Sequence, residues 1–61
     1  MTFTFTEKLE AVDRELKYRR RVYPRWIEAE KMTQALADRQ IAVMEAIRAD
    51  YAIWAQRERL L

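Results

Sequence analysis

The stretch Glu30–Thr33, EKMT, is the predicted turn that decides the fold of this 61-residue chain. Thr33 can cap a second helix, because its hydroxyl can accept a hydrogen bond from a backbone N–H of the first turn. A connection this short makes the helices on either side of it antiparallel neighbours. The sequence therefore predicts an all-α, antiparallel helical hairpin that forms a single domain over residues 1–61.

Helix is expected on both sides of this turn. The chain contains no glycine, a residue that turns favour and helix interiors exclude. Thr4 and Glu7 have the spacing of a capping box, so the first helix is expected to start near Thr4 or Thr6. The second helix is expected to run from Gln34 to about Arg57.

Pro24 interrupts the first helical segment. Inside a helix it removes the hydrogen bond to the carbonyl of Arg20, at a cost of about 3 kcal/mol, and it disfavours helical geometry at Tyr23. Two outcomes are open. The helix either kinks at Pro24 and continues, or ends near Val22 before a short helix restarts. We favour the kink, because the apolar phase continues across Pro24 to Trp26.

Apolar residues recur at helical spacing in both segments and predict the contact between the helices. An antiparallel register places Leu16 near Ile47. The same register places Val12 near Tyr51 and Leu9 near Trp54, with Trp26 facing the start of the second helix around Leu36. Gln40 and Glu58 are polar interruptions of the second stripe, and Arg19 projects toward the first. The residues expected in the core or in an oligomer interface are Leu9, Val12, Leu16, Tyr23, Trp26, Ile41, Met44, Ile47, Tyr51, Ile53 and Trp54.

The chain is also expected to form a homo-oligomer. A compact domain of this size buries only about 60% of its unfolded surface, and small scaffolds need a further source of stability. The sequence has no Cys and no His, so it has no disulfide and none of the usual zinc, haem or iron–sulfur ligands. Ile41 and Ile53 flank the apolar stripe on opposite sides and need another surface to cover them. A dimeric four-helix bundle satisfies these requirements.

The residue types argue against an enzyme. Without Cys and His, the common nucleophile–base pairs cannot be built, and the absence of glycine excludes phosphate-binding loops. A carboxylate metal site is conceivable, but a surface role for these acids is the favoured interpretation. The acids in question are Glu28, Glu30, Asp38 and Glu45. We expect no catalytic residue, cofactor, metal or small-molecule substrate. A signal peptide and a run of about 18 apolar residues are both missing, which predicts an intracellular chain without a membrane partner.

The segment Lys17–Trp26, KYRRRVYPRW, holds five basic residues, three aromatic ones and no acid. A helical wheel places four cations on one side of the first helix with a tyrosine beside them. This candidate binding face comprises Arg14, Lys17, Tyr18, Arg21 and Arg25. Three interpretations are open. It can be a solvated face with i,i+4 ion pairs to Glu10 and Asp13, a surface for an acidic protein, or a phosphate-binding stripe for nucleic acid.

The segments VYPRW (Val22–Trp26) and KMTQALADRQIAVMEAI (Lys31–Ile47) resemble small, uncharacterised helical proteins encoded by bacteriophages and prophages. The resemblance covers roughly Glu15–Tyr51. Proteins of that kind often carry glycine where this chain has Glu30. The resemblance implies a bacterial cytoplasmic setting and supplies no activity.

These observations predict a small, non-enzymatic, phage-type accessory protein. It is expected to be a self-associating helical module that binds another macromolecule, with a host or phage protein favoured over nucleic acid. Nucleic-acid binding through the basic cluster is the alternative, and a purely structural oligomer is the third possibility.

Overall fold

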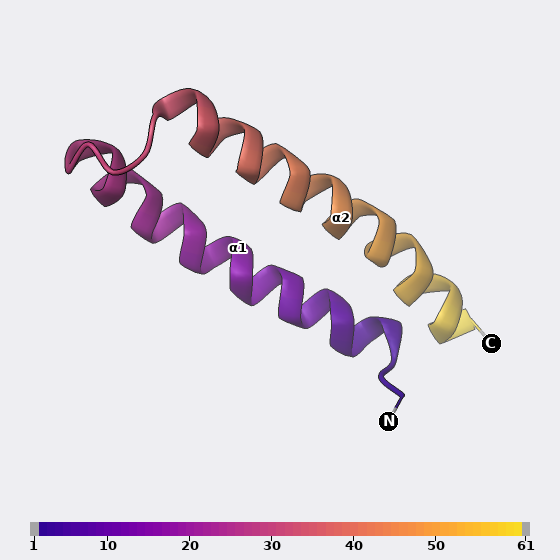
Figure 1. The fold of residues 1–61 in the computed structure, drawn as a ribbon. Coiled ribbons are helices and arrows are strands. Elements are labelled where there is room, and N and C mark those ends of the chain that lie inside the picture. The colour runs from indigo at the N-terminus through magenta and orange to yellow at the C-terminus, as the bar shows by residue number, and fades with distance from the viewer. Residues whose placement is uncertain (1, 61) are drawn as a thin grey trace.

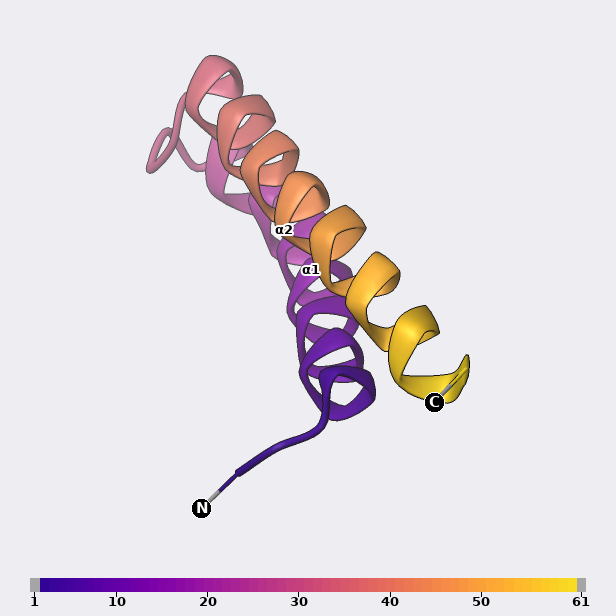
Figure 2. The same ribbon diagram turned by 90° about the vertical axis from the view of Figure 1, so that its right-hand side faces the viewer.

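The computed structural model describes residues 2–60 and consists of two helices joined by a short turn. α1 spans Phe5–Glu28 and α2 spans Gln34–Leu60, and the two run antiparallel (Figure 1). Both chain ends lie at one end of the hairpin and the turn lies at the other. A view turned by 90° shows that the two helix axes are inclined to each other (Figure 2). The predicted all-α helical hairpin is confirmed.

Side chains from both ends of the sequence cap the start of α1. The predicted capping box is present: Thr4 Oγ1 accepts from the N–H of Glu7 at 3.0 Å, and the Glu7 carboxylate accepts from the N–H of Thr4 at 3.2 Å. The N–H groups of Phe5 and Thr6 donate to the carboxylate of Glu58, at 2.9 and 3.2 Å. Glu58, expected only as a polar interruption, therefore ties the last turn of α2 to the first turn of α1.

The turn between the helices is a Schellman motif. The N–H of Glu30 donates to the carbonyl of Ile27 at 3.0 Å, and the N–H of Lys31 donates to the carbonyl of Trp26 at 2.8 Å. These are the two hydrogen bonds that close the C-terminus of a helix in this motif. The motif requires a left-handed residue, and Glu30 fills that position with φ of 57°. Thr33 then caps α2 as predicted, since its hydroxyl accepts from the N–H of Leu36 at 3.1 Å.

α1 continues through Pro24 to Glu28, so the alternative of a helix that ends near Val22 is wrong. Val22 and Tyr23, the two residues before the proline, are buried and pack with Ala37 of α2. Their burial favours a continuous helix and opposes the local preference of proline to end one. Pro24 itself is exposed, at the edge of a hollow that it lines with Ile27 and Ile41.

The core is small and is not the one predicted for α2. The predicted core residues Leu16 and Tyr23 are buried, with 2% and 7% of their surface exposed. Five more of the predicted residues are half-buried, namely Leu9, Val12, Ile41, Met44 and Tyr51. The buried side chains that the sequence analysis missed are Val22, Ala37 and Ala55.

Four predicted core residues lie outside the core of the hairpin: Trp26, Ile47, Ile53 and Trp54 are exposed. Trp54, predicted to lie near Leu9, stacks on Phe5, one turn earlier in α1, with ring centroids 5.6 Å apart. The turns of α1 and α2 that lie side by side are close to those expected. However, α2 is turned about its own axis, so that the residues facing α1 are shifted by one position from those predicted. The residues of α2 that face α1 are Ala37, Ile41, Met44, Arg48, Tyr51, Ala55 and Glu58. The assignment of the exposed four to an oligomer interface stays a prediction.

The hairpin is long and thin, with principal extents of 47 × 19 × 17 Å. Its radius of gyration is 14.2 Å, whereas a compact domain of this length would have about 10.5 Å. Each helix therefore buries only one side, and the other sides are available for solvent or for partners.

Replacing Glu30 by glycine is expected to stabilise the fold by about 1 kcal/mol, because the left-handed backbone is unfavourable for a residue with a Cβ atom. Thermal unfolding followed by circular dichroism should show a midpoint higher by about 4–8 °C. Glu30→Ala is the matched control, since it removes the charge but keeps the Cβ atom, and it should give no comparable gain. Equal midpoints for the two variants would contradict the left-handed geometry at Glu30.

Candidate binding surfaces

The side of α1 that faces away from α2 carries the predicted basic face, defined by Arg14, Lys17, Tyr18, Arg21 and Arg25. All five side chains are exposed. Within residues 2–60, none of the four cations takes part in an ion pair. The guanidinium carbon of Arg21 lies 5.6 Å from the ring centroid of Tyr18, within cation–π range. The helix brings all five residues onto one surface about 17 Å long.

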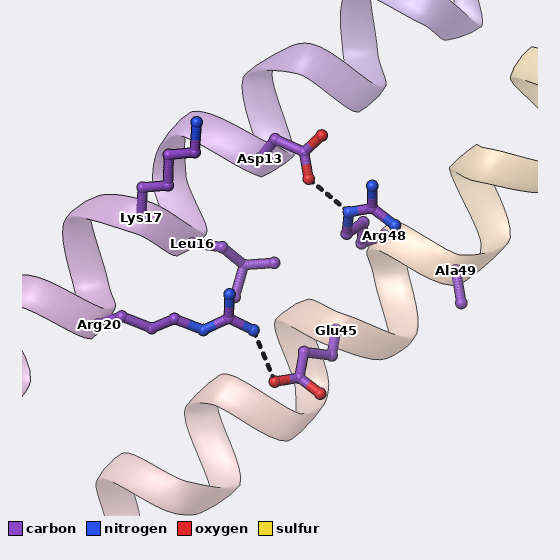
Figure 3. Close-up of a pocket in the computed structure, with 7 residues that line it drawn as sticks. All are labelled: Asp13, Leu16, Lys17, Arg20, Glu45, Arg48 and Ala49. Carbon is purple, nitrogen blue, oxygen red and sulfur yellow. Dashed lines mark hydrogen bonds and ion pairs between the residues drawn. The ribbon is translucent and has the colours of Figure 1, made fainter.

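This surface is less neutralised than the sequence analysis expected. Three acid-to-base pairs at i,i+4 spacing are predicted on α1, namely Glu10–Arg14, Asp13–Lys17 and Glu15–Arg19. Within residues 2–60 only the last of these forms, at 3.0 Å. Asp13, the expected partner of Lys17, pairs with Arg48 of α2. The contact between the helices has therefore removed an acid from the basic face and left the Lys17 ammonium without its predicted partner. Lys17 is at the edge of the hollow lined by both ion pairs, and Figure 3 shows its side chain directed along α1.

Two ion pairs join the helices along one edge of their contact. Arg20 donates to Glu45 at 2.8 Å, and Arg48 donates to Asp13. Leu16 lies between the two pairs (Figure 3). The paired side chains are half exposed to water, so each pair contributes about 0–1 kcal/mol. Each pair links one residue of α1 to one of α2, and together they neutralise Arg20 and Arg48.

The opposite edge of the hairpin is apolar and open. We call this surface the apolar face, and it comprises Trp26, Leu36, Val43, Ile47 and Trp54. Each of these side chains is at least 36% exposed. Trp26 leans on Tyr23 with ring centroids 5.7 Å apart. Arg19 and Gln40 line the same hollow as Trp26, so this edge also holds two polar side chains.

Arg19 is held on this edge by its own helix. Its Nε donates to the Glu15 carboxylate at 3.0 Å, and the hydrogen bond to Glu15 raises the pKa of Arg19. No carboxylate of a second chain is needed to balance this charge.

Glu58 is a functional feature of the fold that sequence reasoning missed. The backbone N–H of Phe5 lowers the pKa of the Glu58 carboxyl, and the N–H and hydroxyl of Thr6 act in the same direction against the opposing effect of burial. The Thr6 hydroxyl donates at 3.1 Å. Sequence spacing carries no signal for this contact, because 52 residues separate Glu58 from Thr6.

Two further kinds of feature concern the described residues, a metal site and a membrane-spanning helix. No three acidic, Cys or His residues between positions 2 and 60 lie close enough to share a metal ion. The conceivable carboxylate site is thus not assembled. In the same part of the chain, neither helix has the length and apolar character needed to cross a bilayer.

Comparisons with family models, with curated proteins and with solved structures found no match to this chain. The resemblance to phage-encoded helical proteins, and the cytoplasmic setting that it implies, therefore stay predictions.

The Glu58 cap makes the stability of the hairpin depend on pH. Because folding lowers the pKa of Glu58, its contribution is complete above the ordinary glutamate pKa and is lost as pH falls through the lowered value. Wild type should therefore melt higher than Glu58→Gln at pH 7, and the difference should shrink as the pH falls below 4. Glu28→Gln, at the opposite end of the hairpin, is the control. A difference that persists unchanged in acid would argue against the cap.

Proposed function

We propose that this protein is a non-enzymatic binding module whose basic face holds an acidic surface of another protein. The observation that carries this proposal is the set of four exposed cations on one side of α1 with no ion-pair partner among residues 2–60. Other cations of the hairpin differ from these four because each already forms an ion pair, namely Arg19, Arg20 and Arg48. A side chain without a partner can give its charge and hydrogen bonds to another molecule.

The distribution of acids favours a protein over nucleic acid. Glu7 and Glu10 lie exposed before the basic face along α1, and Glu28 lies exposed after it. A phosphate backbone that ran along the helix would meet these carboxylates at both ends and be repelled. An acidic patch of limited extent fits between them, and like-charge repulsion at the edges would help to fix its position.

Nucleic acid is the second candidate, and Tyr18 is the observation in its favour. Tyr18 is 45% exposed, and the guanidinium of Arg21 lies over its ring. Exposed aromatic rings next to cations can stack on the bases of a single strand while the cations contact phosphates. Such binding would weaken steeply with salt.

We further propose that the hairpin self-associates into a dimeric four-helix bundle in the bacterial cytoplasm, as a phage-type accessory protein. Support comes from the size of the core, whose buried members are Leu16, Val22, Tyr23, Ala37 and Ala55. Two of these five are alanines, which contribute little buried apolar area. A dimer would also present the basic face twice and strengthen binding to a partner with two acidic sites.

The test compares Arg21→Gln/Arg25→Gln with Lys31→Gln/Arg59→Gln, a control that removes the same charge away from the basic face. Tagged proteins are used to capture partners from bacterial lysate at about 50 and 200 mM salt, with and without nuclease. The basic-face variant should lose the partner and keep its helicity, because the mutated side chains make no core contact. The control should keep the partner.

Three results separate the candidates. Capture that survives nuclease and depends on Arg21 and Arg25 supports a protein partner. Capture that nuclease abolishes supports nucleic acid. Capture that is equal for both variants and insensitive to salt would exclude the basic face as the binding surface, and the absence of any captured partner would favour the structural oligomer.

A further inference from the structure

α2 carries two stripes of coiled-coil spacing, one residue apart. The first faces α1 and includes Ala37, Ile41, Met44, Tyr51 and Ala55, all buried or half-buried. The second, which we call the outer seam, consists of Leu36, Gln40, Val43, Ile47, Asp50 and Trp54. Its members follow at steps of four and three, the spacing of a helix that packs on a partner helix. All of them are exposed except Gln40, which is half-buried.

Two such stripes are what a helix needs to pack on two neighbours. Adjacent residues of an α-helix are about 100° apart around its axis, so the outer seam lies on a different side of α2 from the contact with α1. That angle is close to the corner of a four-helix bundle, where each helix touches two others. α1 supplies one neighbour, and within the hairpin the outer seam has none.

The outer seam is complementary to itself when reversed. Two-fold symmetry requires one patch to match its own copy, with residue i meeting residue j and j meeting i. Antiparallel pairing centred near position 45 sets Val43 opposite Ile47 and Leu36 opposite Trp54. The remaining two members, Gln40 and Asp50, then fall opposite each other. Apolar side chains meet apolar ones, and polar side chains meet polar ones.

Charge decides the direction of this pairing. A parallel pair in register would bring Asp50 of one chain against Asp50 of the other, and like charges repel. The antiparallel pair sets Asp50 against the amide of Gln40, whose N–H can donate to the carboxylate. Arg39, the residue before Gln40, is exposed in the hairpin. In the antiparallel pair it would lie at the outer edge, beside the Asp50 carboxylate of the other copy.

The exposed area is of the right size for such an interface. The hairpin exposes 5093 Å², about 900 Å² more than a compact monomer of 7.4 kDa. A typical specific interface removes about 800 Å² from each partner. A second hairpin on the outer seam would cover surface that the elongated monomer leaves open.

We propose that a second copy of this chain covers the outer seam, with α2 packed antiparallel on α2 about a two-fold axis near position 45. This rests on the proposed self-association and specifies the surface through which it occurs. It revises the expectation from Ile41 and Ile53, since Ile41 packs inside the hairpin and Ile53 is exposed on the back of α2. The basic face of α1 stays uncovered in both copies.

Single-cysteine variants test this geometry, because the natural chain has no cysteine. Full-length Val43→Cys and Ile47→Cys proteins are mixed and treated with a short thiol-specific crosslinker. The expected product is a covalent dimer of the two variants. Ala35→Cys mixed with Ile53→Cys is the matched control. In the proposed antiparallel pair, residue 35 of one copy comes nearly level with residue 53 of the other, but both side chains are exposed on the back of α2 and should stay uncrosslinked.

A charge exchange gives an independent readout by sedimentation. Wild type should sediment at twice the mass of one chain. Asp50→Arg should shift it toward the mass of one chain, and Asp50→Arg combined with Arg39→Asp should restore the dimer. A dimer that crosslinks through the control pair, or that Asp50→Arg leaves intact, would overturn this interface while the proposed self-association stands. A folded wild type that sediments as one chain would overturn both, and the lysate test of the basic face would be unaffected.

Discussion

The packing of bulky side chains of α1 on small side chains of α2 is the constraint on which the rest of this hairpin depends. Tyr23 and Val22 lie against Ala37 near the turn, and Ala55 is buried near the open end. Alanine lets a neighbouring helix approach closely, so α2 turns this side toward α1. Leu36, Val43, Ile47 and Trp54 then point to the side and stay exposed. The open apolar face is thus a direct result of how the small core is filled.

The rotation of α2 also determines which charges are neutralised. With this side turned inward, Glu45 and Arg48 reach across to Arg20 and Asp13 along one edge. Asp13 is then no longer available to Lys17, and the outer side of α1 becomes more basic. The three sides of the molecule therefore differ in charge and polarity because of which side of α2 packs on α1. One edge is bridged by ion pairs, the opposite edge is apolar, and the outer side of α1 is cationic.

Local signals in the sequence were sufficient to predict the two helices and the caps at their N-termini. Thr4 with Glu7 and the hydroxyl of Thr33 act within three residues of the groups that they cap, so spacing alone reveals them. The basic face is equally local, because its members share one helix. The rotation of α2 was not predictable from periodicity, since its two stripes lie one residue apart and both contain large apolar side chains, such as Ile41 and Met44 in one and Ile47 and Trp54 in the other. Ranking residues by hydrophobicity selected Ile47 and Trp54 over Ala37 and Ala55.

The contact of Glu58 with the start of α1 also bears on how the hairpin forms and opens. Pairing of the helices can begin at the Schellman turn, where the closing loop is short and its entropic cost is small. The Glu58 contact closes 52 residues and lies farthest from that turn. The first turn of α1 and the last turn of α2 are therefore expected to be the last parts to assemble and the first to separate. Hydrogen exchange at the first amides of α1 would report this fraying, while the turn and the residues around Tyr23 stay protected.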